Sequence, residues 1–447
     1  MKESNRYDAV VVGSGPNGLA AAITLARNGF SVLVIEASDS LGGGLRSKAL
    51  LQPDCIHDIC AAVHPLALAS PFFRSLPLAD YGVEWIHSPI PLAHPMDDGT
   101  AVVMQRSIEE TAGSLGADAE SYRRLTNTIV NHWEELIPEI LQPMHLPRHP
   151  ISLARFGISA IQSADRLNRS RFREDRTRSL FAGLASHSIQ PFDRRGTAAF
   201  GIILGATAHA VGWPIAKGGS GTIAKAMASY LISLGGEIRT GILVRSMKEI
   251  PPSRAVLFDL TPHQLASIDG LDFSPGYRRK LQHHRYGPGV FKMDWILDGP
   301  ITWTAPDCIR SATIHLGGGY QEIADAESQV WQGKHPEQPL VILAQPSAFD
   351  PSRAPKGKHI VWAYCHVPNG SEFDMSERIE IQIELGDILP LAARHGHCAV
   401  ESAVEIDGRL LLDARMREIL HGAHDGRHVL DALEGLANGL GHFLEQV

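Results

Sequence analysis

The sequence contains little of what marks a secreted, fibrous or disordered chain. Only five of its 447 residues are cysteines, and their odd number and irregular spacing argue against a disulfide framework. We therefore expect reduced thiols in a cytoplasmic protein. The chain has no internal repeat and no low-complexity segment. Its first ten residues, MKESNRYDAV, are polar and lead directly into an expected strand, so neither a signal peptide nor a transit peptide is predicted.

Positive charge is also in short supply. The 41 lysines and arginines are outnumbered by 49 aspartates and glutamates, and the formal net charge of −8 argues against a nucleic-acid partner. The most basic stretch, residues 163–178, is typical of the solvated face of a helix, with contact to an anionic membrane as the alternative. A hydrophobic content of 44% over this length supports at least one large core and favours two.

Long apolar runs are nearly absent. Residues 198–216 carry no charge and are long enough to cross a bilayer, but three glycines, a histidine and a proline make them a poor span. We expect a buried helix there that lines an apolar pocket, suited to a lipid-like substrate. Among the 22 histidines, His421, His424 and His428 share a helical spacing, but a metal would need a further ligand. No metal site is predicted.

The N-terminus, in contrast, carries a complete nucleotide-binding pattern. Residues 9–12 form an apolar run typical of a buried parallel strand, and the run ends at Gly13, Gly15 and Gly18 in G-x-G-x-x-G spacing. The first glycine permits a sharp turn, the second lets a pyrophosphate approach the backbone, and the third lets a helix pack close to the strand. Pro16 suits the first helical turn, where no hydrogen-bond donor is needed.

A second strand completes this pattern. Residues 31–35 are again apolar and end at Glu36, where an acidic residue is expected to hold ribose hydroxyls and to disfavour a 2′-phosphate. Strand, helix, second strand and acid all fall in register, so the sequence predicts a dinucleotide site. A glycine-rich structural turn is the alternative.

The next residues resemble a known flavoprotein family. Gly43, Gly44 and Arg46, preceded by Gly42, form a G-G-x-x-R type extension similar to that of amine oxidases and phytoene desaturases. The resemblance implies FAD as the cofactor, with the glycines admitting its backbone and the arginine lying near phosphate. A flexible surface loop after an NAD-binding unit is the alternative.

Similarity to the same family continues over roughly residues 7–384. The run from His57 to Pro65 resembles the segment where the chain leaves the cofactor domain near the flavin, so His57 and His64 could lie near the ring, although hydrogen-bonded structural roles are the simpler interpretation. Residues 218–247 resemble the return of the chain to that domain, with Val244 at the adenine end.

Only one catalytic candidate emerges. Residues 286–303 resemble a substrate-domain strand with Phe291 on its apolar face and Lys292 on the other. Lys292 matches, in chain order, the lysine that holds a water near the flavin in the amine-oxidase branch. An exposed lysine on a strand is the simpler interpretation.

The fold expected from these observations is α/β plus α+β. A discontinuous Rossmann-type FAD-binding domain, residues 1–80 and 215–265, accompanies a mixed-sheet and helical substrate domain, residues 81–214 and 266–384. Residues 385–447 form a divergent tail.

The resemblance implies an FAD-dependent oxidoreductase that transfers a hydride to the flavin from an apolar small molecule, isoprenoid or lipid-like. The alternatives are a non-catalytic flavin- or nucleotide-binding scaffold and an NAD-dependent dehydrogenase. Peripheral membrane contact and a homo-oligomer are both compatible with the sequence.

The tail departs from the family pattern. Family members continue to a glycine-rich segment, near G-G-G-V-x-G, that closes over the flavin ring, and this chain has no such cluster. An amphipathic helix is predicted instead, from the spacing of Val429, Leu433, Leu436, Leu440 and Phe443. We therefore expect weak or substoichiometric FAD binding.

Overall fold

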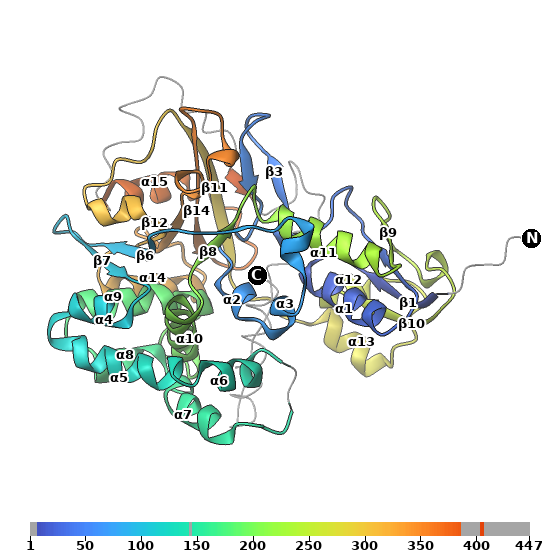
Figure 1. Cartoon of the computed structure of the whole chain (residues 1–447), viewed down its shortest axis with the longest axis horizontal. Coiled ribbons are helices and arrows are strands. Elements are labelled where there is room, and N and C mark those ends of the chain that lie inside the picture. Colours follow the sequence, from blue (N-terminus) through green and yellow to red (C-terminus); the bar gives the residue numbers. More distant parts are fainter. Residues whose placement is uncertain (1–6, 143–144, 386–402, 406–447) are drawn as a thin grey trace, which may run out of the picture.

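The N-terminal sheet joins strands that are far apart in the sequence. A computed structural model describes residues 7–142, 145–385 and 403–405. β1 (Tyr7–Val12) lies between β10 (Ser253–Phe258) and β2 (Val32–Ile35), and β9 (Glu237–Arg239) follows β2, with every pairing parallel. The chain therefore leaves this sheet after β2 and returns to complete it, as the expected discontinuous Rossmann-type unit requires (Figure 1).

Both faces of this sheet are covered, which explains the unbroken apolar run of β1. On one face, α1 (Pro16–Arg27) and α11 (Gly221–Ser233) pack together over the strands, with Ile23 and Met227 fully buried. On the other face, Val244 and Ile250 pack against Val10. The short helices α12 (Pro262–Ala266) and α13 (Pro275–Gln282) follow β10.

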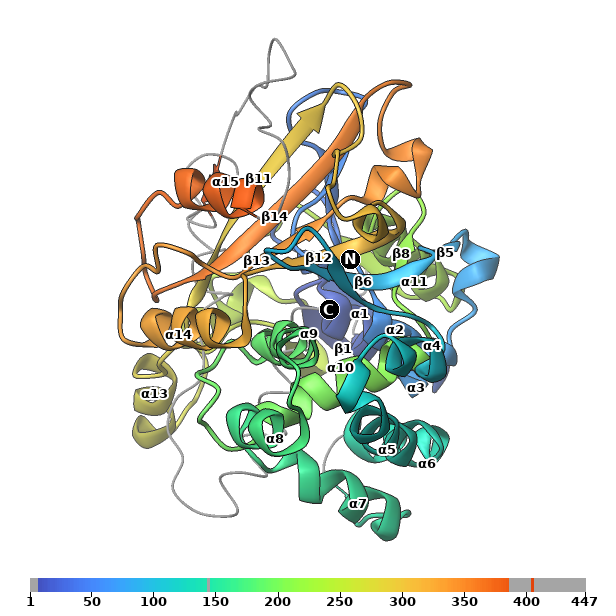
Figure 2. The ribbon, with the colours of Figure 1, turned by 90° about the vertical axis from the view of Figure 1, so that its left-hand side faces the viewer.

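The second sheet is mixed and larger. Its order is β15-β11-β14-β13-β12-β6-β7, and Figure 2 shows β11 and β14 running beside each other as long strands. The strand bounds are β6 (Ile90–Pro95), β7 (Ala101–Met104), β11 (Gly289–Leu297), β12 (Ser311–Leu316), β13 (Val341–Ala344), β14 (His359–Val367) and β15 (Ala403–Glu405). The alternating pattern of residues 82–103 predicts a hairpin whose turn is formed by Asp97, Asp98 and Gly99. This prediction is confirmed, because β6 and β7 pair antiparallel across that turn.

Each face of the second sheet has its own core. Phe291, Met293 and Trp295 of β11 pack with α15 (Ser376–Leu385) on the outer face, as the predicted apolar face of this strand requires. The inner face looks toward a layer of helices, and Leu92 and Ile342 are buried between the two.

α10 (Thr197–Ala210) is the centre of the helical layer and is buried along almost its whole length. A buried helix in residues 198–216 is thus confirmed, and no helix in the described part of the chain is long and apolar enough to cross a membrane. The surrounding helices are α2 (Pro65–Ala69), α3 (Pro71–Arg74), α4 (Ile108–Gly113), α5 (Ala119–Val130), α6 (Trp133–Ile140), α7 (Pro150–Ala160), α8 (Ala164–Arg171), α9 (Asp175–Ala185) and α14 (Tyr320–Trp331).

The sequence also predicts a helix over residues 107–140, a strand over residues 237–247 and a buried parallel strand over residues 254–260, and each differs from the element observed. The continuous helix expected over residues 107–140 is divided into α4, α5 and α6, because α4 stops at Gly113 and Gly116 adopts a positive φ of 53°. The strand expected to reach Met247 ends at Arg239, before Gly241, which has φ of 69°. β10 lies at the sheet edge and is partly exposed instead of buried.

A small hairpin links the two sheets. β3 (Ser47–Ala49) and β4 (Ile56–Asp58) pair antiparallel directly after the glycine-rich loop, and β4 also contacts β14. A second short pair, β5 (Trp85–His87) and β8 (Pro214–Ala216), ties the chain segments that enter and leave the helical layer.

Asp58 at the end of β4 holds three segments together. Its carboxylate accepts hydrogen bonds from Ser47 Oγ at 2.7 Å, from the Ser220 backbone N–H at 2.8 Å and from Arg353 Nη2 at 2.6 Å. Asp58 and Arg353 are both fully buried. Burial alone would raise the pKa of Asp58, but the Arg353 guanidinium and the hydrogen bonds outweigh it and hold this pKa below its ordinary value.

Replacing Arg353 by Met is expected to lower the free energy of unfolding by about 3 to 5 kcal/mol, because the Asp58 carboxylate would remain buried without its cation. Urea unfolding at neutral pH measures this difference. The double variant Arg353→Met, Asp58→Asn should recover part of the loss, since it removes the isolated charge. Wild-type stability in the single variant would show that the pair contributes nothing.

Candidate functional site

The turn between β1 and α1 requires glycine at two points. Gly13 has a φ of 108°, and a Cβ there would lie 2.5 Å from the carbonyl oxygen of Asp259. A Cβ on Gly18 would lie 2.3 Å from the carbonyl oxygen of Gly13, so only glycine lets α1 sit this close to the strand. α1 begins at Pro16, the first helical position predicted from the sequence.

The glycine-rich loop packs directly on this turn. A Cβ on Gly43 would lie 3.0 Å from Gly15 Cα, which brings the two segments to within backbone contact. Within the described residues, no group accepts a hydrogen bond from the backbone N–H of Gly43 or Gly44. Backbone donors next to a helix N-terminus suit an anionic diphosphate.

The other residues predicted to bind the cofactor surround these glycines. Glu36 accepts hydrogen bonds from the N–H of Ser14 at 2.9 Å and the N–H of Ser38 at 2.8 Å, which fix its carboxylate at the end of β2. A carboxylate offers about four acceptor positions, so Glu36 can still accept a hydrogen bond from a ribose hydroxyl. Arg46 is buried, and its Nε donates to the Gly43 carbonyl at 2.9 Å, so the guanidinium supports the loop.

Asp259 is a site residue that the sequence reasoning missed. It follows β10, and its Oδ2 accepts a hydrogen bond from the Gly18 N–H at 2.8 Å. The same oxygen lies 2.9 Å from the position that a Gly15 Cβ would occupy. The space that a dinucleotide fingerprint leaves for a pyrophosphate is therefore bordered by a carboxylate. Its position directly after an expected strand was the signal available in the sequence, since ligands bind at the carboxyl ends of parallel strands.

The hairpin β3-β4 carries the chain from the glycine-rich loop to the second sheet. The backbone N–H of Ile59 donates to the Arg46 carbonyl at 2.8 Å, and a Cβ on Gly44 would lie 3.7 Å from Cys60 Cβ. Burial raises the pKa of the Cys60 thiol, and both Arg46 and Lys292 act on it in the opposite direction. Cys60 thus lies within electrostatic reach of the loop and of the predicted catalytic lysine.

Lys292 is buried, so its interpretation as an exposed strand lysine is wrong. Its side chain is 3% exposed, and Nζ lies 2.5 Å from Asp294 Oδ2, while His57 Nδ1 lies 3.0 Å from the other oxygen of that carboxylate. Burial would raise the pKa of Asp294, but the Lys292 ammonium and the His57 hydrogen bond lower it overall. The three side chains form a lysine–aspartate–histidine cluster on the inner face of β11, facing β4.

Aromatic rings continue this cluster along β14. Lys292 Nζ lies 5.4 Å from the ring centroid of Trp362, and the rings of Trp362 and Tyr364 stack 5.7 Å apart at 21°. Trp362 is buried, but Tyr364 is partly exposed in a strand whose other central residues are buried. In the described part of the chain, the indole N–H of Trp362 has no acceptor.

The second histidine named from the sequence has a structural bond of its own. His64 Nε2 lies 2.8 Å from Ser220 Oγ, next to the Asp58 network, and burial lowers the pKa of His64 to about 4. His64 is therefore neutral at physiological pH. The structural interpretation of both histidines is supported, since His57 holds Asp294 and His64 holds the start of α11.

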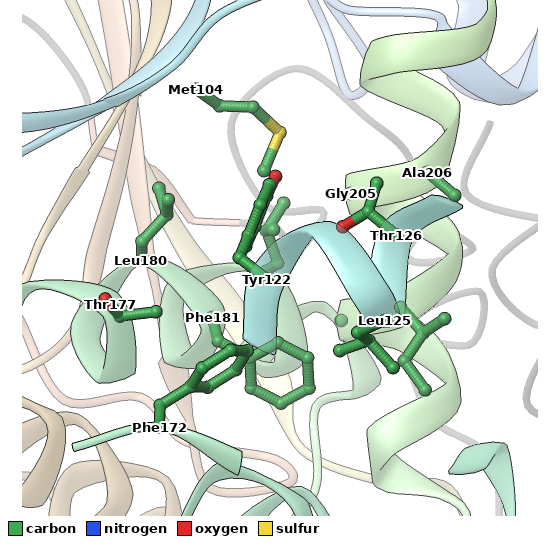
Figure 3. A pocket seen from close by; sticks show the side chains of 13 residues that line it. Met104, Tyr122, Leu125, Thr126, Phe172, Thr177, Leu180, Phe181, Gly205 and Ala206 are labelled. Carbon is green, nitrogen blue, oxygen red and sulfur yellow. The ribbon is translucent and has the colours of Figure 1, made fainter. Parts of the chain in front are cut away.

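α10 lines a small apolar cavity, as expected. Figure 3 shows its wall, to which α5 contributes Tyr122 and Thr126, α9 contributes Phe181, and α10 contributes Gly201 and Gly205. Its volume of about 20 Å³ accommodates roughly one water molecule. A lipid-sized ligand would have to displace side chains here.

Two other expectations concern cysteines and metals. The cysteines of the described residues, Cys55, Cys60, Cys308 and Cys365, are free thiols. The described ranges contain no group of three metal-ligating side chains placed to hold an ion. The histidines at 421–428 and the predicted C-terminal helix lie outside the described residues.

Comparison with known proteins agrees with this geometry. Residues 11–76 match the family model of an NAD(P)-binding Rossmann-like domain. The chain is 27% identical over 403 residues to a phytoene dehydrogenase of Streptomyces griseus, covering 80% of this chain and 73% of that protein. The chain is therefore similar to a phytoene dehydrogenase over most of its length, which supports the resemblance carried by its sequence motifs.

Other comparisons extend this relationship. A phytoene desaturase of Fusarium fujikuroi is 25% identical over 388 residues, covering 79% of this chain, which spans 65% of that relative's length. A putrescine oxidase solved with putrescine bound shares the fold, with a TM-score of 0.58 and 17% identity over 96% of this chain and 89% of that one. The chain therefore shares the fold of this oxidase, as its resemblance implied.

Replacing Asp259 by Asn is expected to tighten dinucleotide binding about a hundredfold. Two like charges about 5 Å apart at an effective dielectric constant of about 20 repel by about 3 kcal/mol, and asparagine keeps an oxygen to accept the Gly18 N–H. Titration of the purified protein with FAD and with NAD measures the dissociation constants.

The control for Asp259→Asn is Asp98→Asn, which removes a carboxylate from the β6-β7 turn instead. Unchanged or weaker dinucleotide binding by the Asp259 variant would show that this carboxylate does not oppose a diphosphate.

Proposed function

We propose that this phytoene desaturase-like oxidoreductase uses FAD to oxidise an apolar, isoprenoid or lipid-like substrate by hydride transfer. The observation that carries this proposal is the continuous path from the fingerprint to Lys292. Gly15 contacts Gly43, the loop continues to Arg46, and the hairpin that follows delivers His57 to the buried Lys292–Asp294 pair.

The residues present fit FAD at the nucleotide end. The N-terminus of α1 and the backbone N–H groups of Gly43 and Gly44 would hold the diphosphate, Glu36 the adenosine ribose, and Val244 the adenine. Bound FAD would supply a hydride acceptor that no protein side chain provides. Asp259 opposes this binding electrostatically, which is a second reason, besides the divergent tail, to expect weak affinity.

The protein's own residues would make the reaction site dry and would hold a lysine ammonium, paired with a carboxylate, in a fixed position. Lys292 and Asp294 are almost fully removed from solvent, and the pairing with Asp294 and His57 fixes the lysine ammonium. A fixed cation in a water-poor site stabilises negative charge that develops nearby more strongly than a solvated one. We assign this electrostatic role to Lys292.

The apolar substrate class is supported by the inner face of the second sheet. The rings of Trp362 and Tyr364 stack on this face. Trp362 packs with Ala62 and Ala344, and Tyr364 packs against the apolar core to which the uncharged α10 contributes. Two relatives are named for phytoene, a hydrocarbon, which fits such surroundings. Orientation within the site would come from few polar groups, chiefly Tyr364 and Lys292.

The decisive experiment is the visible spectrum of the purified protein after incubation with FAD and gel filtration. We expect a flavin spectrum at less than one FAD per chain, and none for Gly15→Val, because a valine side chain would occupy the approach to the diphosphate. Gly299→Val, at a bend with open space around it and no positive φ, is the control for substitution itself. A colourless wild-type protein that is stabilised against heat by NAD and not by FAD would overturn the flavin assignment.

Replacing Lys292 by Met should lower the two-electron reduction potential of the bound flavin by about 30 mV, equivalent to about 1.4 kcal/mol, because it removes a buried positive charge. Equilibration with reference dyes measures the potential. Lys358→Met is the matched control, since Lys358 lies at the surface of the same sheet and pairs with Asp298. An unchanged potential, together with undiminished flavin reduction by an apolar substrate, would remove Lys292 from the site.

A further inference from the structure

The most exposed large apolar side chains of the described residues lie close together in one short stretch. Leu146, Ile151 and Ile158 are 91%, 68% and 69% exposed, and every other exposed large apolar side chain is below 60%. Scattered single apolar residues on a surface are ordinary, but three in thirteen positions are not. Leu146 precedes α7, and Ile151 and Ile158 lie on it.

α7 has two distinct faces. Ile151, Ala154 and Ile158 are exposed at helical spacings of three and four, so they form one stripe. Phe156 and Ala160 are buried on the opposite side, where α7 contacts α5 and α10. Figures 1 and 2 show α7 at the outer end of the helical layer, away from both sheets. Its exposed stripe has no partner among the described residues.

The charged side chains of residues 141–164 are all basic, and Arg148 and Arg155 are both exposed beside the isoleucines. Two glutamates of α6 lie against this stretch: Glu135 contacts Ser152, and Glu139, almost fully buried, pairs with His145 at 3.1 Å. Arg155 Nη1 lies 2.8 Å from His132 Nε2 and forms no ion pair among the described residues. This contrasts with the net charge of −8 of the whole chain. Apolar side chains flanked by basic ones match the interface of an anionic bilayer.

We propose that α7, together with residues 145–149, docks the protein on the surface of an anionic lipid bilayer. The inference rests on the proposed function, in which the substrate is apolar. α7 packs against α5 and α10, and these two helices line the apolar cavity shown in Figure 3. Docking through this helix brings the helical layer, and not the dinucleotide site, next to the lipid phase in which an apolar substrate is dissolved.

The test is cosedimentation of the full-length protein with vesicles of phosphatidylcholine alone and of phosphatidylcholine mixed with phosphatidylglycerol. Wild-type protein is expected to bind the mixed vesicles at low salt and to bind phosphatidylcholine at least about tenfold more weakly. Ile151→Glu with Ile158→Glu should reduce binding to the mixed vesicles by at least about tenfold, since two apolar anchors become anions. The double variant Arg148→Gln, Arg155→Gln should lose only the electrostatic part of binding to the mixed vesicles, which is the part that added salt removes from the wild type.

The matched control is Ile232→Glu with Ile309→Glu, which changes two isoleucines of 58% and 50% exposure outside α7. This control should bind vesicles like the wild type. Absence of vesicle binding by the wild type, or equal loss in the control, would overturn the proposal. Dissociation of a wild-type dimer by the α7 variant, without vesicle binding, would instead show that α7 meets a second copy of the chain.

A decrease in unfolding temperature specific to the α7 variant would indicate that another segment of this chain covers the stripe, and would also overturn the proposal. The FAD spectrum in the absence of vesicles is measured in parallel. It tests the proposed function separately, so that failure of docking and failure of flavin binding are distinguished.

Discussion

The buried carboxylate of Asp58 is the contact on which the arrangement of the two sheets depends. It joins the hairpin that follows the glycine-rich loop, the beginning of α11 and the turn that contains Arg353. A carboxylate with three donors in a site without water is intolerant of displacement, because each lost bond leaves a buried polar group unsatisfied.

Neighbouring side chains of β4 contact two different charged clusters, one on each face of the strand. Side chains alternate along a strand, so His57 points to Asp294 while its neighbour Asp58 points to Arg353. The position of Lys292 relative to the glycine-rich loop therefore depends on a hairpin of few residues, which is held by the contacts of His57 and Asp58 at the end where Asp58 pairs with Ser47. We infer that disturbance of the Asp58 network would also move the Lys292–Asp294–His57 cluster.

The sequence was informative where the constraint is local. The glycines at 13, 15 and 18, Pro16 and the two apolar strands are specified by neighbours within about thirty residues, and the structure agrees with the pattern. Lys292 was misjudged as exposed because strand alternation identifies a face but not what covers it. Its burial depends on His57 and Trp362, which are distant in sequence.

Asp259 shows the same limitation in a different form. Strand β10 was expected, but its place beside β1 was needed to see that the next residue reaches Gly18. The residues assigned to FAD and the domain boundaries stay predictions, since they describe a bound state and a division that pairing alone does not establish.

The long excursion between β2 and β9 has a consequence for synthesis. β1 pairs with β10 through Tyr7 and Ser253, so the ribosome must produce the helical layer before the edge of β1 can be covered. Until then the apolar strands VVV and VLVI expose unpaired backbone of the kind that templates aggregation. Such high contact order makes folding slow, and newly made chains depend on protection until β10 has left the ribosome.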